Sequence, residues 1–122
     1  MSSFRSVIPL LRVADSRRTQ SLFELLAFRS LWEHQESPET PRFVEMHRDG
    51  VSVFLSEHGG DGPFGVQVYF VVDDADALFQ SVQGRDIRCS AEPHDAAWGH
   101  RVFELEDFDG NTLRFGSPIE GD

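Results

Sequence analysis

The chain has 122 residues, which is enough for one domain with a core of its own and too short for two. Its 21 acidic and 11 basic residues give a formal net charge of -10, which argues against nucleic acid or an anionic membrane surface as a partner. All the basic residues apart from histidine are arginines, so Schiff-base chemistry on a lysine is excluded.

Targeting signals and membrane spans are not evident in the sequence. No apolar run approaches the roughly 20 residues that cross a bilayer, and the N-terminus lacks the apolar core of a signal peptide. The single cysteine, Cys89, excludes an internal disulfide and fits a reducing compartment. We therefore expect a cytoplasmic protein.

The first half of the chain predicts the order strand, helix and three strands. Asp15 or Ser16 can cap a helix that runs to about Leu26, because an oxygen-bearing side chain there accepts bonds from the first helical amides. Arg48-Asp49-Gly50 is typical of a hairpin turn. The expected strands are residues 6–13, 29–35, 43–47 and 51–56.

The second half repeats this order after a glycine-rich linker, residues 58–63. Asp73-Asp74 can cap a helix over residues 75–82, and Asp109-Gly110 supplies the turn of a final hairpin spanning residues 98–116. The remaining expected elements are strands at 66–72 and 87–91, with a loop over 92–97.

A repeat of about 60 residues relates the two halves. The helix caps Asp15 and Asp74 lie 59 residues apart, and the turns at Gly50 and Gly110 lie 60 apart. We predict a single α+β domain, residues 1–122, built from two βαβββ modules in a curved mixed sheet with its helices outside. Module one covers about 4–57, the linker 58–63, and module two about 64–119.

The final hairpin carries a family resemblance. Trp98-Gly99-x-Arg101-x-Phe103, followed by the run from Asp107 to Leu113 that includes Asp109-Gly110-Asn111, resembles the end of bleomycin-resistance proteins. These belong to the vicinal oxygen chelate superfamily, which also holds glyoxalases and dioxygenases. The segments 7–15 and 71–78 resemble the openings of the two modules of that superfamily. The chain departs from its pattern at Ala27, Val102 and Phe108, where glycine, glutamate and proline are usual.

The resemblance implies a homodimer with exchanged strands and two ligand grooves at its interface. The metal-dependent members of the superfamily place their ligands at positions that match Ile8, Gln67 and Arg114 here. An aliphatic side chain and a guanidinium cannot ligate a metal ion, and no two of the five histidines have ligand spacing within one element. We therefore expect no metal and no cofactor.

Strand alternation predicts which residues face the groove. Phe103, Leu105, Leu113 and Phe115 should pack under a helix, and the opposite parity should line the cavity. Glu104 and Arg114 could pair across the hairpin. The cavity-facing set is Ile8, Leu10, Arg12, Gln67, Tyr69, Val71, Val102, Glu104, Thr112 and Arg114.

Aromatic residues complete the candidate site. Trp98 matches the position at which resistance proteins stack an aromatic ring on flat parts of the drug, although it could instead plug the loop. Trp32 and Phe28 could form the opposing wall. The expected ligand-binding residues are Trp98, Tyr69, Gln67, Trp32, Phe28, Glu104 and Arg114.

The function expected from these features is capture rather than catalysis. The resemblance implies a metal-free dimer that sequesters a planar, cationic aromatic antibiotic or metabolite, although Arg12 and Arg114 leave an anionic or neutral ligand open. We expect no catalytic residue, since Cys89 in a strand is typical of a small core residue. One alternative is an atypical lyase, isomerase or dioxygenase-like enzyme of the superfamily that uses Gln67 and Glu104. Another is a regulatory domain whose own side chains fill the cavity.

Overall fold

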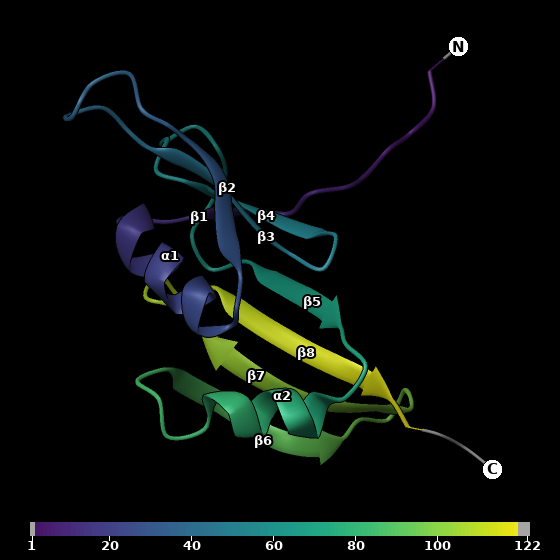
Figure 1. The fold of residues 1–122 in the computed structure, drawn as a ribbon. Helices are drawn as coiled ribbons and strands as arrows, with labels where there is room; N and C mark the ends of the chain where they lie inside the picture. Colours follow the sequence, from purple (N-terminus) through teal and green to yellow (C-terminus); the bar gives the residue numbers. More distant parts are fainter. Residues whose placement is uncertain (1, 120–122) are drawn as a thin grey trace. The chain divides into compact units, whose positions relative to one another are not determined.

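The computed structural model describes residues 2–119 of the chain. It divides into two compact units, Met1–Gly62 and Pro63–Asp122, and the division falls inside the segment expected as a linker. Within residues 2–119 the chain forms two helices and eight strands in two mixed four-stranded sheets, which confirms the predicted α+β fold of two βαβββ modules (Figure 1). No helix in the described range is long and apolar enough to span a membrane.

In the first unit, helix α1 covers one face of a four-stranded sheet (Figure 1). The sheet order is β1-β4-β3-β2, with β1 parallel to β4 and the other neighbours antiparallel. Val44 and Leu55 point toward the helix and are fully buried, as are Leu11 and Phe23. The elements are β1 (Leu10–Arg12), α1 (Ser16–Leu25), β2 (Arg29–His34), β3 (Phe43–Arg48) and β4 (Val51–Ser56).

Local chemistry explains where these elements begin and end. The Asp15 side chain accepts a hydrogen bond from the Arg17 amide at 3.1 Å and caps α1, as predicted. Ala27, just beyond the helix, has a φ of 65°, a left-handed conformation that favours glycine. Asp49 and Gly50 both have positive φ, 51° and 78°, which a two-residue hairpin turn with the twist of the strands requires.

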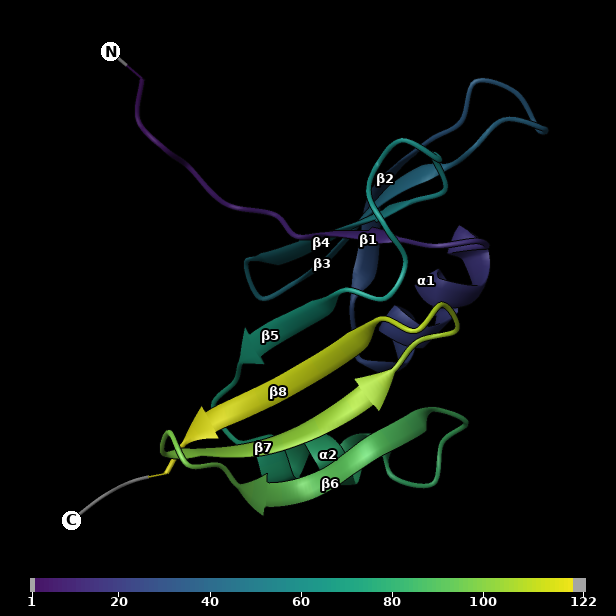
Figure 2. The same cartoon turned by 180° about the vertical axis from the view of Figure 1, so that it is seen from behind.

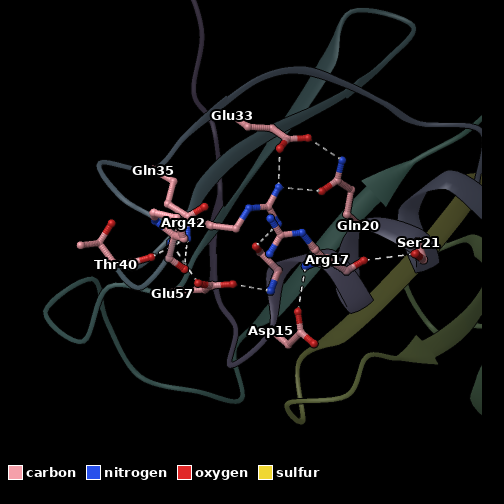
Figure 3. A network of polar contacts seen from close by, with 11 residues as sticks. Asp15, Arg17, Gln20, Ser21, Glu33, Gln35, Thr40, Arg42 and Glu57 are labelled. Carbon is pink, nitrogen blue, oxygen red and sulfur yellow. Dashed lines mark hydrogen bonds and ion pairs between the residues drawn. The ribbon is translucent and has the colours of Figure 1, made fainter.

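A buried arginine ties the loop before β3 to the start of α1 (Figure 3). Arg42 is only 3% exposed, and its guanidinium donates to the Ser16 hydroxyl at 2.6 Å and forms an ion pair with Glu33. The carboxylate of Glu57 accepts from the Ser16 amide at 2.8 Å and from the Arg42 amide at 2.9 Å. Gln20 donates to the second oxygen of Glu33 at 3.0 Å. The buried charge is therefore paired and hydrogen-bonded, as burial demands.

The second unit repeats the arrangement with helix α2 against one face of its sheet (Figure 2). The sheet order is β5-β8-β7-β6, and β5 and β8 are the parallel pair. Asp74 caps α2 by accepting a hydrogen bond from the Ala77 amide at 3.1 Å. The elements are β5 (Gln67–Val71), α2 (Ala75–Val82), β6 (Arg88–Asp95), β7 (His100–Glu106) and β8 (Thr112–Pro118).

The helix-facing side of this sheet is aromatic. Phe79 of α2 packs edge-on against Phe103, with ring centroids 5.4 Å apart, and Phe103 stacks on Phe115 at 5.0 Å. Leu105 and Leu113 lie beside them and are at most 1% exposed. The prediction that these hairpin residues pack under a helix is confirmed.

The turn between β7 and β8 reverses the chain and also forms hydrogen bonds to the segment before β5. The Asp107 carboxylate accepts from the backbone amide of Asn111 at 2.8 Å and from its side-chain amide at 2.7 Å. The Asn111 side-chain oxygen then accepts from the amides of Gly65 and Val66, at 3.1 and 3.0 Å. Asn111 is fully buried, and it holds the beginning of β5 against the start of β8.

Two predicted boundaries were wrong. The first strand begins at Leu10 rather than at residue 6, since Pro9 has no amide hydrogen with which to extend the ladder and pairs only through its carbonyl. Strand β6 continues through residues 92–95, which were expected to form a loop. It can include Pro93 because it is an edge strand, and two register shifts interrupt its pairing with β7. Cys89 on this edge is exposed and is not a core residue.

Candidate functional site

The side of the second sheet that faces away from α2 carries polar and charged side chains and the ring of Tyr69. Tyr69 of β5 lies beside Arg114 of β8 in the strand register, and Arg114 lies opposite Glu104 of β7. These residues alternate along their strands with the buried core residues, so they share the opposite face. We call this surface, together with Trp98 and His100 at its edge, the second open face.

A chain of hydrogen bonds crosses the second open face. The indole Nε1 of Trp98 donates to the Tyr69 hydroxyl at 3.1 Å, and this hydroxyl lies 2.6 Å from Nδ1 of His100. An indole can only donate, so the Tyr69 hydroxyl accepts from Trp98, and the His100 tautomer sets the direction of the second hydrogen bond. Tyr69 thereby holds Trp98, which sits in the turn between β6 and β7, at one end of the chain.

Gly116 makes room for this tyrosine. A Cβ atom at position 116 would overlap the Tyr69 hydroxyl and would lie 2.7 Å from its Cζ and 3.0 Å from Nδ1 of His100. No real side chain tolerates such contacts without movement, so the ring can lie across β8 only where the strand has no side chain. The glycine is therefore part of the site, although it presents no chemistry of its own.

Arg114 links the aromatic part of the face to an acidic residue. Its Nε and Nη2 atoms each lie 3.0 Å from Oε2 of Glu104, which confirms the predicted cross-strand pair. Its guanidinium carbon also lies 5.8 Å from the centroid of the Trp98 ring, within the range of a cation–π contact. Arg114 and Glu104 are 25% and 19% exposed, so the pair is shielded from water and orients the indole from one side.

The other predicted residues of this unit lie at different depths. Gln67 is exposed at the beginning of β5, opposite Thr112. Val102 has the predicted parity but is buried, at 1% exposure, beside Gly116 in the register. His100 was not predicted as a site residue, although its even position in β7 gives it the same parity as Val102 and Glu104.

The first unit has an aromatic open face of its own. Trp32 stacks on Phe43 with centroids 5.7 Å apart and planes 8° apart, and Phe54 lies 5.8 and 5.0 Å from these two rings. The Trp32 indole donates to Glu45 at 2.7 Å, and Ser52 donates to the other oxygen of this carboxylate at 2.6 Å. We call this surface the first open face.

Phe28 does not join Trp32. It is only 8% exposed and packs edge-on against Phe23 of α1, with centroids 5.1 Å apart. The backbone explains this placement, because the Phe28 amide bonds to the Phe23 carbonyl at 3.0 Å as the chain leaves the helix. Phe28 therefore belongs to the core of the first unit rather than to a ligand-binding wall.

Groups that could support chemistry are few. Among residues 2–119 no three His, Cys, Asp or Glu side chains are grouped so as to hold a metal ion. Partial desolvation, together with the carboxylates of Glu92 and Glu104, raises the pKa of the Cys89 thiol, which makes it a poor nucleophile at neutral pH. Arg12 donates to the Gly59 carbonyl at 3.2 Å, so its guanidinium is directed toward the linker.

Comparison with known proteins gives one family and a consistent fold. The model of a family described as "Glyoxalase superfamily protein" matches residues 2–122. None of the curated proteins matches the sequence.

Similar solved structures include three whose likeness extends over nearly the whole chain. TnmS3, an antibiotic binding protein from Streptomyces sp. CB03234, is 22% identical with a TM-score of 0.73, over 96% of this chain and 99% of that one. TioX from Micromonospora sp. ML1 is 21% identical with a TM-score of 0.75, over 93% and 100%. A bleomycin resistance determinant encoded on the transposon Tn5 is 18% identical with a TM-score of 0.75, over 94% and 98%. At these identities the likeness shows the fold.

Proposed function

Because this chain belongs to the glyoxalase superfamily, we propose that it works as one of the superfamily's binding proteins, sequestering a planar, cationic aromatic molecule without changing it chemically. The molecule would stack on Trp98 at the second open face. We further propose that two copies form a homodimer, so that each site is lined by both.

The observation that carries the proposal is the fixed but uncovered indole of Trp98. The side chain is 57% exposed, although the Tyr69 hydroxyl holds its Nε1 and the Arg114 guanidinium lies 5.8 Å from its ring centroid. A ring that is already oriented loses little conformational freedom when a ligand stacks on it.

Charge supports a cationic ligand. The formal net charge of -10 would raise the encounter rate of a cation with the whole molecule. At the site itself Glu104 neutralises Arg114, so the arginine near Trp98 does not present an unpaired positive charge to the ligand.

The known binding proteins of similar fold suggest the probes. TnmS3 is an antibiotic binding protein, and the Tn5 protein is a bleomycin resistance determinant. Bleomycin has planar heteroaromatic rings and a cationic end, so it presents both features that the site would recognise.

The test is calorimetric titration of metal-free and copper-loaded bleomycin into the purified protein. We expect one binding event per site, and a loss of at least about tenfold in affinity for Trp98→Ala, because stacking on one aromatic ring contributes about 1–3 kcal/mol. Chromatography of the released ligand should return it unaltered. Full affinity in Trp98→Ala would contradict the proposed site, and a modified ligand would favour an enzyme.

A further inference from the structure

We propose that His100 makes ligand capture at the second open face depend on pH, admitting a cation when its imidazole is neutral and opposing it when the imidazole is protonated. This regulation acts on the site at Trp98 and therefore rests on the proposed function. The hydrogen-bond chain from Trp98 through Tyr69 to His100 carries it.

The imidazole of His100 has a fixed place on the second open face. The residue begins strand β7, lies opposite Pro118 of β8 in the register and is half-buried. Its Nδ1 lies 2.6 Å from the Tyr69 hydroxyl, and the centroids of the two rings are 5.8 Å apart. A Cβ atom at Gly116 would lie 3.0 Å from the same nitrogen. The imidazole is therefore held two hydrogen bonds away from the Trp98 indole, on which the ligand would stack.

Protonation of the imidazole changes how this chain is connected. The Tyr69 hydroxyl has one proton and accepts a hydrogen bond from the Trp98 indole. When Nδ1 of His100 carries no proton, it accepts the hydroxyl proton, and all three groups are satisfied. An imidazolium carries a proton on both nitrogens, so its Nδ1 can only donate, and the hydroxyl proton must turn to another acceptor. The neutral imidazole therefore suits the chain that orients the indole.

Protonation would also bring an unpaired positive charge to the second open face. Within residues 2–119 no carboxylate forms an ion pair with His100. The other cation near Trp98 is Arg114 of β8, and it is already paired with Glu104 of β7. A cation stacked on Trp98 would therefore meet the charge of His100 without a carboxylate to offset it.

The remaining charged groups near the beginning of β7 are occupied on the other side of the sheet or lie in water. Arg101 has the parity of the residues that face α2, and it forms ion pairs with Asp76 of α2 and Asp95 of β6. Asp73, beyond the end of β5, is exposed. Its charge is therefore screened by solvent and does not replace a direct partner for His100.

The sign of the pH effect follows from this arrangement. Histidine is the side chain whose charge ordinarily changes between about pH 5 and 8. As the pH falls through the titration of His100, a cation on Trp98 gains a neighbour of the same charge. Its affinity should fall about fivefold, as expected for one partly screened charge at short range. Because the coupling is reciprocal, capture of the cation should release protons from the protein in the same pH range.

The test measures the affinity of ethidium, a planar aromatic cation whose own charge stays constant, at steps between about pH 5.5 and 8. The parent protein should bind it about fivefold more weakly at the acid end. His100→Asn keeps a group that can bond to Tyr69 but cannot become charged, so its affinity should vary by less than about twofold. Equally tight binding by the parent across the range, or a pH dependence that persists in His100→Asn, would overturn the proposal and leave the proposed function standing.

His94→Asn is the matched control. It removes an exposed histidine of the neighbouring strand β6, whose Nδ1 lies 2.9 Å from the Glu92 carbonyl oxygen and makes no contact with the hydrogen-bond chain. This variant should keep the pH dependence of the parent protein. Loss of the pH dependence in His94→Asn would assign the effect to another histidine and contradict the role of His100.

NMR of the free protein gives a second measurement that needs no ligand. The indole N–H signal of Trp98, assigned with Trp98→Phe, should move with pH in step with the imidazole C–H signals of His100, because protonation reverses the hydrogen bond to Tyr69. The movement should disappear in His100→Asn. A Trp98 signal that does not follow His100 would contradict the switch even if ethidium binds. Failure of ethidium to bind at any pH would remove the proposed function, and the pH-dependent capture with it.

Discussion

At Gly116 and at Ala27, the absence or presence of a Cβ atom determines which local arrangement is favourable. At Gly116 the absence of a Cβ lets Tyr69 lie across β8 and bond to both Trp98 and His100. At Ala27 a Cβ is present in a left-handed conformation, where it is unfavourable. The steric effect at Gly116 and the backbone strain at Ala27 are independent of hydrophobicity and charge. Each can be tested by one substitution.

Substituting Gly116 with alanine should disturb the hydrogen-bond chain. The new methyl group would push the Tyr69 ring away, at a cost of about 1–3 kcal/mol in unfolding free energy, and would free the Trp98 indole. Thermal unfolding and the Trp98 indole NMR signal measure the two effects. Gly59→Ala, which has open space around it, is the matched control. If Tyr69→Ala does not reduce the cost of Gly116→Ala in a double-mutant cycle, the steric account is wrong.

Replacing Ala27 with glycine should stabilise the protein. Relief of the left-handed strain outweighs the greater freedom of glycine in the unfolded chain, with an expected gain of about 0.5–1 kcal/mol. The corresponding position after α2 already holds a glycine, Gly84, with a φ of 82°. Chemical denaturation measures the gain. Ala97→Gly, at an exposed alanine without positive φ, should give no increase, and a fall in stability for Ala27→Gly would refute the explanation.

At the scale of elements, a few polar side chains hold the loops to the regular structure. Glu57 accepts from the amides at the start of α1 and before β3, and Asn111 does the same for the start of β5. Burial alone would raise the pKa of Glu57, but the bonds from the Ser16 and Arg42 amides lower it overall. Hydrogen bonds from Gln20 and Arg42 also lower the pKa of Glu33. Both carboxylates are therefore more stable as anions in the folded chain.

The pH dependence of stability follows from these shifts. A carboxyl group with a lowered folded pKa contributes its full stabilisation above its unfolded value, near 4.3, and loses it as the pH falls through the folded value. We expect Glu57→Gln to lower the unfolding free energy at pH 7 by about 1–3 kcal/mol. Its loss of stability between pH 5 and 3 should be smaller than that of the parent protein.

Urea denaturation across pH 3–7 measures both effects of this substitution. Glu39→Gln removes an exposed carboxylate of the same type and should leave the curve of the parent protein unchanged. A Glu57→Gln protein as sensitive to acid as the parent would show that Glu57 does not contribute to acid sensitivity.

Element order was predictable because its signals are local. Asp15 and Asp74 cap helices, and Asp49-Gly50 adopts the positive φ angles of a tight hairpin. Alternation also placed Tyr69, Glu104 and Arg114 on one face. The misplaced residues depend on contacts that alternation does not describe. Phe28 is turned into the core by the end of α1, and β6 extends through Pro93 only because it lies at an edge.

At the scale of the whole molecule, the two units share one register but differ in what their open faces hold. The repeat was visible in the spacing of caps and turns. The contrast between Glu45 beside Phe54 and Glu104 beside Arg114 becomes meaningful only when the strand pairing is known. On a common framework, one open face thus holds a carboxylate with neutral hydrogen-bond donors, and the other holds an internal ion pair.

The exposed apolar residues of the second open face predict self-association. Val71 is 68% exposed and shares its face with Tyr69 and Trp98, so we expect a second copy to cover it. Sedimentation equilibrium should give a mass near twice 13.8 kDa. Val71→Asp should weaken the dimer, whereas Val51→Asp, at an exposed hairpin position of the first unit, should not. A monomeric parent protein would refute this expectation.

The irregular edge strand β6 bears on the concentration that the protein can reach without aggregating. Its proline and its two register shifts break the row of amides and carbonyls with which another β-strand could pair. A protein that captures its ligand one for one must accumulate to the concentration of what it captures, unlike a catalyst that works in traces. For the binding role proposed above, an interrupted edge and the mutual repulsion of acidic molecules would let the protein reach such concentrations without forming aggregates.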